Sequence, residues 1–233
     1  MKKILKHLGT NWYKYLLELI VITAGVLGAF ALNSWNEENK SLQQSRDILI
    51  DVKENVDLNT AQFQKDIETN KEVINSIDII LTNLTVTKVY TDSLEKHFRY
   101  ASWWATAIWR SSGYEALIDH GVDIVESKEL SNSIVELFEI TYPLIAENTR
   151  LAEGNWIAIL PSWLEHIDRD ASDFTSAAEH GARPFDYQEL LESRVFRSML
   201  TFMRSQRLVE IHLRESAIEK NQELIELINM ELE

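Results

Sequence analysis

The segment Arg99–Arg110, RYASWWATAIWR, holds side chains that could bind a small ligand. Trp103, Trp104 and Trp109 offer aromatic faces, and the guanidinium of Arg110 could pair with an anion or stack on a ring. Aromatic residues at helical spacing more often fill a hydrophobic core. Two hypotheses therefore stand for this segment, a ligand pocket and a buried aromatic face.

A single carboxylate, Glu18, interrupts the apolar stretch from Tyr15 to Leu32. Eighteen residues are close to the number that one helix needs to cross the hydrocarbon core of a bilayer. A carboxylate at this depth usually faces protein or water, so Glu18 could fix a helix contact or couple an ion or proton to a membrane complex. Alternatively, it could pair with Lys14, four residues earlier, at the membrane surface.

Small residues share one face of this expected membrane helix with Glu18. Gly25 and Ala29 fall on the stripe of Glu18, and Ala24 and Gly28 repeat the same four-residue spacing beside it. Small residues at this spacing let another membrane helix approach closely. We therefore expect the helix to associate with a second copy or with another membrane protein.

Other residue types that carry out catalysis are scattered. Arg207 and His212 have the spacing of a helical ribonuclease motif, which is a remote alternative because an acidic chain repels RNA. Two local groups could hold a metal, but each lacks a second cluster of ligands: His120 with Asp119 and Asp123, and His166 with Asp168 and Asp170. Glycine-rich phosphate loops and zinc-protease motifs are absent from the sequence. We expect neither an enzyme nor a cofactor or metal site.

The flanks of the apolar stretch predict its orientation. Four lysines precede it, whereas few basic residues follow closely, so the amino end should stay in the cytoplasm. Ala29-Phe30-Ala31 resembles a signal-peptidase site, but the apolar run is longer than a typical signal peptide and contains Glu18. We therefore expect three parts in an inner-membrane protein: a cytoplasmic segment 1–14, a membrane helix 15–35 and an exported domain 36–233.

Charge and cysteine content exclude several kinds of partner and site for the exported part. The net charge is −14, and 36 of the 37 acidic residues lie after the membrane stretch, which makes nucleic acid a poor partner. The chain has no cysteine, which excludes disulfides, thiolate metal sites and cysteine nucleophiles.

Residue patterning predicts an all-α exported domain. Seven glycines and three prolines supply few of the turns that an all-β domain needs. Apolar residues at heptad spacing run through 36–84 with one four-residue shift, which predicts a long helix with coiled-coil character. We expect an antiparallel bundle in which the last helix lies beside this one.

Local signals place the remaining elements. We expect a turn or extended piece at 82–92, a helix at 93–110, a helix at 114–120 stopped by Gly121, and a helix starting at Ser127. The polar stretch 168–184 should be a loop, and Asp186 should cap an uninterrupted helix that runs to the end.

The end of the membrane stretch and a later segment carry a family resemblance. They comprise Asn33, Trp35, Asn36 and Glu37, then Tyr114-Glu115-Ala116-Leu117, Gly121, Lys128-Glu129-Leu130 and Ile134. This combination resembles a domain-of-unknown-function family of bacterial proteins with one amino-terminal membrane helix. The resemblance implies a membrane-anchored helical protein and supplies no activity. Trp35 would then lie among the lipid headgroups, with the amides in water or against a partner.

Overall fold

The computed structural model describes residues 2–169 and 182–233, and these residues are almost entirely helical. The prediction of an all-α fold is confirmed. The chain divides into two compact units, Met1–Ile48 and Leu49–Glu233. The boundary falls inside the first helix, α1 (Lys2–Thr82), so the predicted long helix over 36–84 is present.

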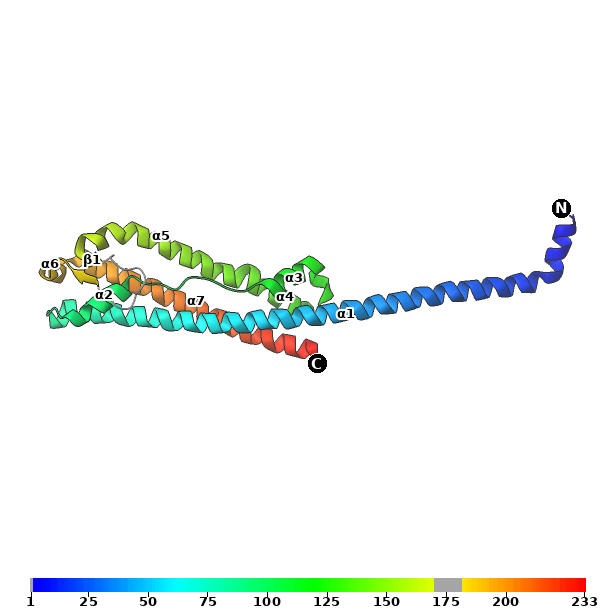
Figure 1. The fold of residues 1–233 in the computed structure, drawn as a ribbon, viewed down its shortest axis with the longest axis horizontal. Helices are drawn as coiled ribbons and strands as arrows, with labels where there is room; N and C mark the ends of the chain where they lie inside the picture. The colour runs from blue at the N-terminus through cyan, green and yellow to red at the C-terminus, as the bar shows by residue number, and fades with distance from the viewer. Residues whose placement is uncertain (1, 170–181) are drawn as a thin grey trace. The chain divides into compact units, whose positions relative to one another are not determined.

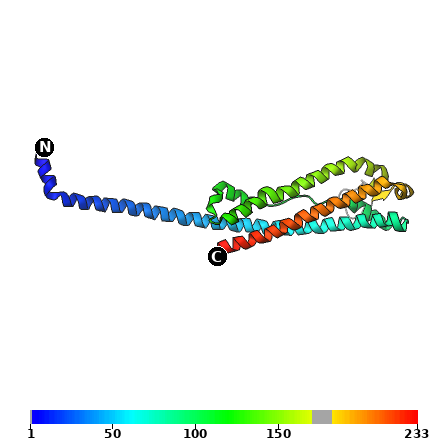
Figure 2. The same ribbon diagram turned by 180° about the vertical axis from the view of Figure 1, so that it is seen from behind.

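Three long helices form the second unit. The part of α1 that follows Leu49 lies beside α7 (Arg194–Leu232), and α5 (Tyr142–His166) lies along α7 (Figures 1 and 2). Shorter elements connect them, namely α2 (Glu95–Ala101), α3 (Ser112–His120), α4 (Lys128–Glu136) and α6 (Tyr187–Glu192), with single turns η1 (Asn83–Thr87), η2 (Asp92–Leu94), η3 (Val122–Ile124) and η4 (Leu137–Thr141).

The predicted antiparallel pairing of α1 with the last helix is present. Lys53 Nζ donates to Asn229 Oδ1 at 2.6 Å near one end of the pair. Arg204 Nε donates to Asp78 Oδ1 at 2.7 Å near the other end. Residue numbers therefore rise along α1 as they fall along α7, which defines the direction and register of the two helices.

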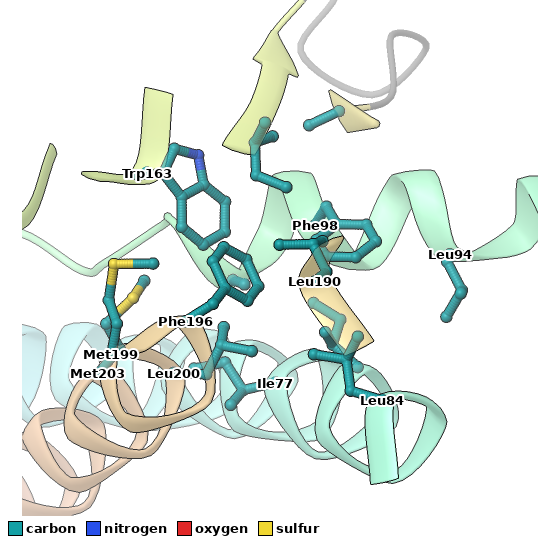
Figure 3. Close-up of a cluster of buried hydrophobic side chains, with 14 of the residues drawn as sticks. Ile77, Leu84, Leu94, Phe98, Trp163, Leu190, Phe196, Met199, Leu200 and Met203 are labelled. Atoms are coloured by element: carbon teal, nitrogen blue, oxygen red, sulfur yellow. The ribbon is translucent and has the colours of Figure 1, made fainter. Parts of the chain in front are cut away.

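A hydrophobic cluster lies where α2, α6, the end of α5 and the start of α7 meet the end of α1 (Figure 3). The Trp163 ring stacks on Phe196 with centroids 5.6 Å apart, and Phe98 contacts the same ring from α2 at 6.4 Å. Each of these three side chains is fully buried. Burying aromatic rings on this scale is a major source of folding free energy in a small domain, so these rings help to hold this end of the bundle together.

The sequence prediction of a helix from 93 to 110 is wrong beyond Ala101. Residues 103–111, named the strap, run as extended chain along the bundle (Figure 1). Asn59 of α1 explains the difference, because its Oδ1 accepts from Arg110 N at 2.7 Å and its Nδ2 donates to Arg110 O at 2.9 Å. A buried side chain thus binds backbone groups that a helix would have paired internally.

Two predicted elements have different limits in the structure. The last helix is interrupted, because Ser193 caps α7 by accepting from Phe196 N at 3.1 Å after α6 has ended. The predicted cap at Asp186 is confirmed, since Asp186 accepts from two backbone N–H groups of α6. The expected loop begins and ends with a short antiparallel pair, β1 (Ile167–Arg169) and β2 (Ala182–Pro184). Its middle lies outside the described residues.

Gly113 of α3 lies directly against the backbone of α1. A Cβ on this residue would be 2.4 Å from Val52 N and 2.6 Å from Asp51 C. Gly113 N also donates to Asn55 Oδ1 at 2.9 Å, which holds α3 at this distance. No residue other than glycine fits here without a backbone shift.

Replacing Gly113 by alanine is expected to destabilise the protein by about 1–3 kcal/mol or more, because backbone atoms cannot move aside as a flexible side chain would. Gly154→Ala is the matched control, since a Cβ there meets nothing within 4 Å. It should stabilise α5 by up to about 1 kcal/mol. Chemical denaturation followed by circular dichroism measures both, and equal stabilities would contradict the close contact.

Candidate functional site

The first unit exposes a long apolar surface. From Leu16 to Leu32 the large apolar side chains are 48 to 72% exposed, and none of the most apolar 18-residue window is buried. Its mean hydropathy is 2.1. An exposed apolar surface of this size is typical of a site of contact with a membrane or with another protein. By length and composition, this part of α1 can span a membrane.

The small-residue face of that segment is open. A Cβ at Gly25 or Gly28 would meet nothing within 4 Å, and Ala29 is exposed. Glu18 is also exposed, and among the described residues it forms no ion pair, so the alternative pairing with Lys14 is not seen. The structure therefore leaves this face available for contact with another helix.

The motif that closes the segment is bonded within its own helix. Asn33 Nδ2 donates to Glu37 Oε1 at 2.9 Å, and Asn39 Nδ2 donates to the carbonyl oxygen of Trp35 at 2.8 Å. The Trp35 ring remains 65% exposed and Asn36 is exposed as well. An exposed indole one turn beyond an apolar helix is typical of the headgroup region of a membrane.

The structure does not bring the predicted tryptophan pocket together. Along the strap, the Trp104 ring lies 5.9 Å from Trp156 of α5, and the Trp109 ring lies 5.9 Å from Tyr142. Trp103 and Arg110 are exposed. Trp104 and Trp109 thus pack against different parts of α5, and the geometry of these two rings fits core packing better than a shared cage.

A buried ionic cluster between α1 and α7 was not predicted. Arg214 Nε donates to Asp66 Oδ2 at 3.3 Å, and Arg207 Nη1 donates to Glu210 Oε1 at 3.1 Å. Asn70 Nδ2 donates to the other oxygen of Glu210 at 3.2 Å. All five side chains are buried, and Glu210 and Arg214 are fully so. This ionic cluster consists of Asp66, Asn70, Arg207, Glu210 and Arg214.

Burial governs the electrostatics of the ionic cluster. It raises the pKa of Glu210 because the charged carboxylate is removed from water, and the guanidiniums of Arg207 and Arg214 offset part of that rise. Burial likewise lowers the pKa of Arg207. The guanidinium carbon of Arg207 also lies 5.8 Å from the centre of the Trp104 ring, a favourable cation–π distance. Two positive and two negative formal charges balance in this site.

Three polar atoms of the ionic cluster form no hydrogen bond: Asn70 Oδ1, Arg207 Nε and Arg214 Nη2. Buried polar groups usually have a partner, so these atoms add to the free-energy cost of burying the charges. The sequence did contain a signal for the ionic cluster. Arg207, Glu210 and Arg214 recur at steps of three and four on the stripe that α7 buries, where apolar residues are the rule.

The residues of the ribonuclease-like motif and of the two possible metal groups do not come together in a site. Arg207 is buried in the ionic cluster, whereas His212 is exposed, so the structure does not place the two side chains of the ribonuclease-like motif on one accessible face. The rings of His120 and His166 hydrogen-bond to backbone carbonyls of their own helices. The described residues include no group of three metal-ligating side chains, and Asp170 lies outside them.

No family model, curated protein or solved structure matches this chain. The resemblance to the bacterial family of single-span proteins therefore stays a prediction.

Replacing Arg214 by methionine is expected to cost about 3–5 kcal/mol of stability, because it leaves Asp66 and Glu210 buried with one cation fewer. Arg204→Met is the control, since the ion pair of Arg204 with Asp78 is partly exposed and should contribute at most about 1 kcal/mol. Urea unfolding of each purified variant measures the difference. Similar losses for both would contradict the expected cost of leaving a buried carboxylate without this cation.

Proposed function

We propose that this chain is a single-pass membrane protein whose helical bundle serves as an interaction or sensing module. The observation that carries the proposal is the apolar segment of α1, which is exposed over its whole length. Such a surface is unfavourable in water and favourable in the hydrocarbon core of a bilayer. The bundle, in contrast, has a buried hydrophobic core and a sequence in which acidic residues outnumber basic ones.

Charge asymmetry supports an inside amino end and an exported bundle in the cytoplasmic membrane. Lysines cluster before the apolar segment, and basic residues near the membrane favour the cytoplasmic side. An acidic bundle would avoid anionic headgroups, since like charges repel. The family resemblance implies the same layout.

Assembly through the membrane helix supports the interaction role. The face that carries Glu18, Gly25 and Ala29 is open and allows close contact with another helix, either a second copy or another membrane protein. Among lipid tails, close packing and interhelical hydrogen bonds replace the hydrophobic effect as the driving force. The carboxylate at one end of this face supplies a hydrogen-bonding group.

The wild-type chain is expected to stay with membranes after extraction at high pH. Ile22→Arg combined with Val26→Arg should release it, because each arginine at the centre of a span costs about 2.5–3.5 kcal/mol. Leu208→Arg, at an exposed position on α7, should not. Fractionation followed by immunoblotting measures the distribution. Release of the wild-type chain would overturn the proposal.

Cysteine labelling in intact cells tests the orientation. The sequence has no native cysteine, so an introduced cysteine is the one thiol that can be labelled. A membrane-impermeant maleimide should label Ser205→Cys on α7 and should leave His7→Cys unlabelled until the cells are opened. The reverse pattern would place the bundle in the cytoplasm.

A second candidate function is suggested by Glu18, whose carboxylate forms no ion pair among the described residues. The chain would then be an accessory subunit of an ion-coupled complex, with Glu18 as the titrating group.

Glu18→Gln separates the two functions. If Glu18 holds helices together, the substitution should reduce co-purification of the assembled partner about threefold or more, in line with measured interhelical polar contacts. Leu27→Gln, on the opposite face of the helix, is the control and should have little effect. Unchanged assembly with loss of the complex's ion flux would favour the coupling role instead.

A further inference from the structure

A basic segment, residues 2–14, precedes the apolar segment of α1 and belongs to the same helix. It contains four lysines and one histidine, and no acidic residue occurs in the sequence before Glu18. The chain as a whole has a net charge of −14, so this short segment has the opposite sign to the rest. A concentrated positive charge of this kind attracts an anionic partner.

Helical geometry separates the residues of the basic segment onto two sides. At 100° per residue, the lysines fall within an arc of about 120°. The aliphatic residues and the tryptophan fall within a second arc of about 100°, whose centre is about 170° away. The lysines are Lys2, Lys3, Lys6 and Lys14, and the apolar residues are Ile4, Leu5, Leu8 and Trp12. A basic side opposite an apolar side with leucine and tryptophan is typical of helices that lie in the surface of a membrane.

The backbone of α1 places the basic segment within reach of a membrane surface. The segment continues directly into the apolar segment, so even Lys2 is only about 21 Å of helical rise from Leu16. At their junction Trp12 and Tyr13 are 61 and 55% exposed, and Lys14 is exposed as well. In Figures 1 and 2, the amino-terminal end of α1 turns away from the line of the apolar segment. A helix that turns there can lie along a surface instead of projecting from it.

We propose that the basic segment lies along the cytoplasmic surface of the membrane and binds the headgroups of anionic phospholipids through its lysines. This inference rests on the proposed membrane location. The apolar side of the segment then enters the boundary between headgroups and acyl chains, with Trp12 nearest to the span. A straight helix that projected into the cytoplasm would instead leave Leu5 and Leu8 in water, which is unfavourable.

Charge and tethering select lipid headgroups over other anions. Each lysine near an anionic membrane surface strengthens binding about fivefold. The attraction falls off within about 8–10 Å at ordinary salt concentrations, so the nearest anions matter most. For a segment that ends where the span begins, those anions are the headgroups of the same membrane. A nucleic acid or a soluble acidic protein would have to be recruited from solution.

Reconstitution of the full chain into lipid vesicles tests the inference. Leu5→Cys places a single thiol on the apolar side of the basic segment, and an environment-sensitive fluorophore is attached to it. The vesicles consist of phosphatidylcholine alone or of an equal mixture of phosphatidylcholine and phosphatidylglycerol, each with a nitroxide-labelled lipid. Quenching of the fluorophore should be at least twofold stronger in the anionic vesicles, because the lysines hold the segment at their surface.

Replacing lysines in the labelled chain tests their role. Lys2→Gln, Lys3→Gln and Lys6→Gln together should reduce the quenching in anionic vesicles to the level in phosphatidylcholine. The matched control removes the same charge from three exposed lysines of the bundle and should leave the quenching unchanged. Its substitutions are Lys65→Gln, Lys88→Gln and Lys96→Gln.

Two results would overturn the inference: equal quenching in the two kinds of vesicle, or a control variant that loses as much quenching as the lysine variant. Retention of the chain in the vesicles after extraction at high pH is measured on the same samples. A retained chain without lipid-dependent quenching would refute only the contact of the basic segment with headgroups. A chain that is released from both kinds of vesicle would refute the proposed span together with that contact.

Discussion

Amide and carboxyl side chains on the buried face of α1 determine how the rest of the bundle is placed. Asn55 and Asn59 bind backbone groups at the start of α3 and at the end of the strap. One and two turns beyond Phe63, Asp66 and Asn70 meet the charged groups of α7. A buried polar group costs free energy unless it finds its partner, so a shift of register by one turn would be penalised at every one of these positions. Hydrophobic burial stabilises the bundle, and this polar series selects a single arrangement.

Aromatic side chains determine how α5 is placed against α1 and α7. Tyr142 is fully buried, donates to Asn221 Oδ1 at 2.9 Å, and contacts Phe63 edge-on at 5.3 Å. Burial raises the pKa of its hydroxyl far above the working range, so the group stays a neutral donor. Asn221 of α7 thus links α5 to α1, because its Oδ1 accepts from Tyr142 and its Nδ2 donates to Thr60 Oγ1 at 2.8 Å. The side of α5 that faces away is free of such constraints.

Patterns that depend on local spacing predicted the structure well. The long first helix, the stop at Gly121, the cap at Ser127 and the antiparallel last helix all follow from apolar periodicity and capping residues. The strap could not be predicted in this way. Its aromatic residues have helical spacing, but its backbone is bound instead by the side chain of Asn59, a residue about 50 positions away. The ionic cluster was missed for a similar reason. Charged residues on a helix are normally assigned to its solvated side, and only their positions on the buried stripe of α7 indicate otherwise.

The first and last helices of the bundle are partners across almost the whole chain, since Lys53 and Asn229 are separated by 176 positions. During synthesis, the apolar stripe of α1 therefore emerges long before the helix that covers it. Contacts between such distant segments form slowly, because a large loop must close before they contribute. Until α7 is complete, the growing polypeptide exposes the apolar stripe of α1 and is prone to aggregation. Correct folding of this chain thus depends on keeping the apolar stripe of α1 away from other polypeptides until α7 has been made.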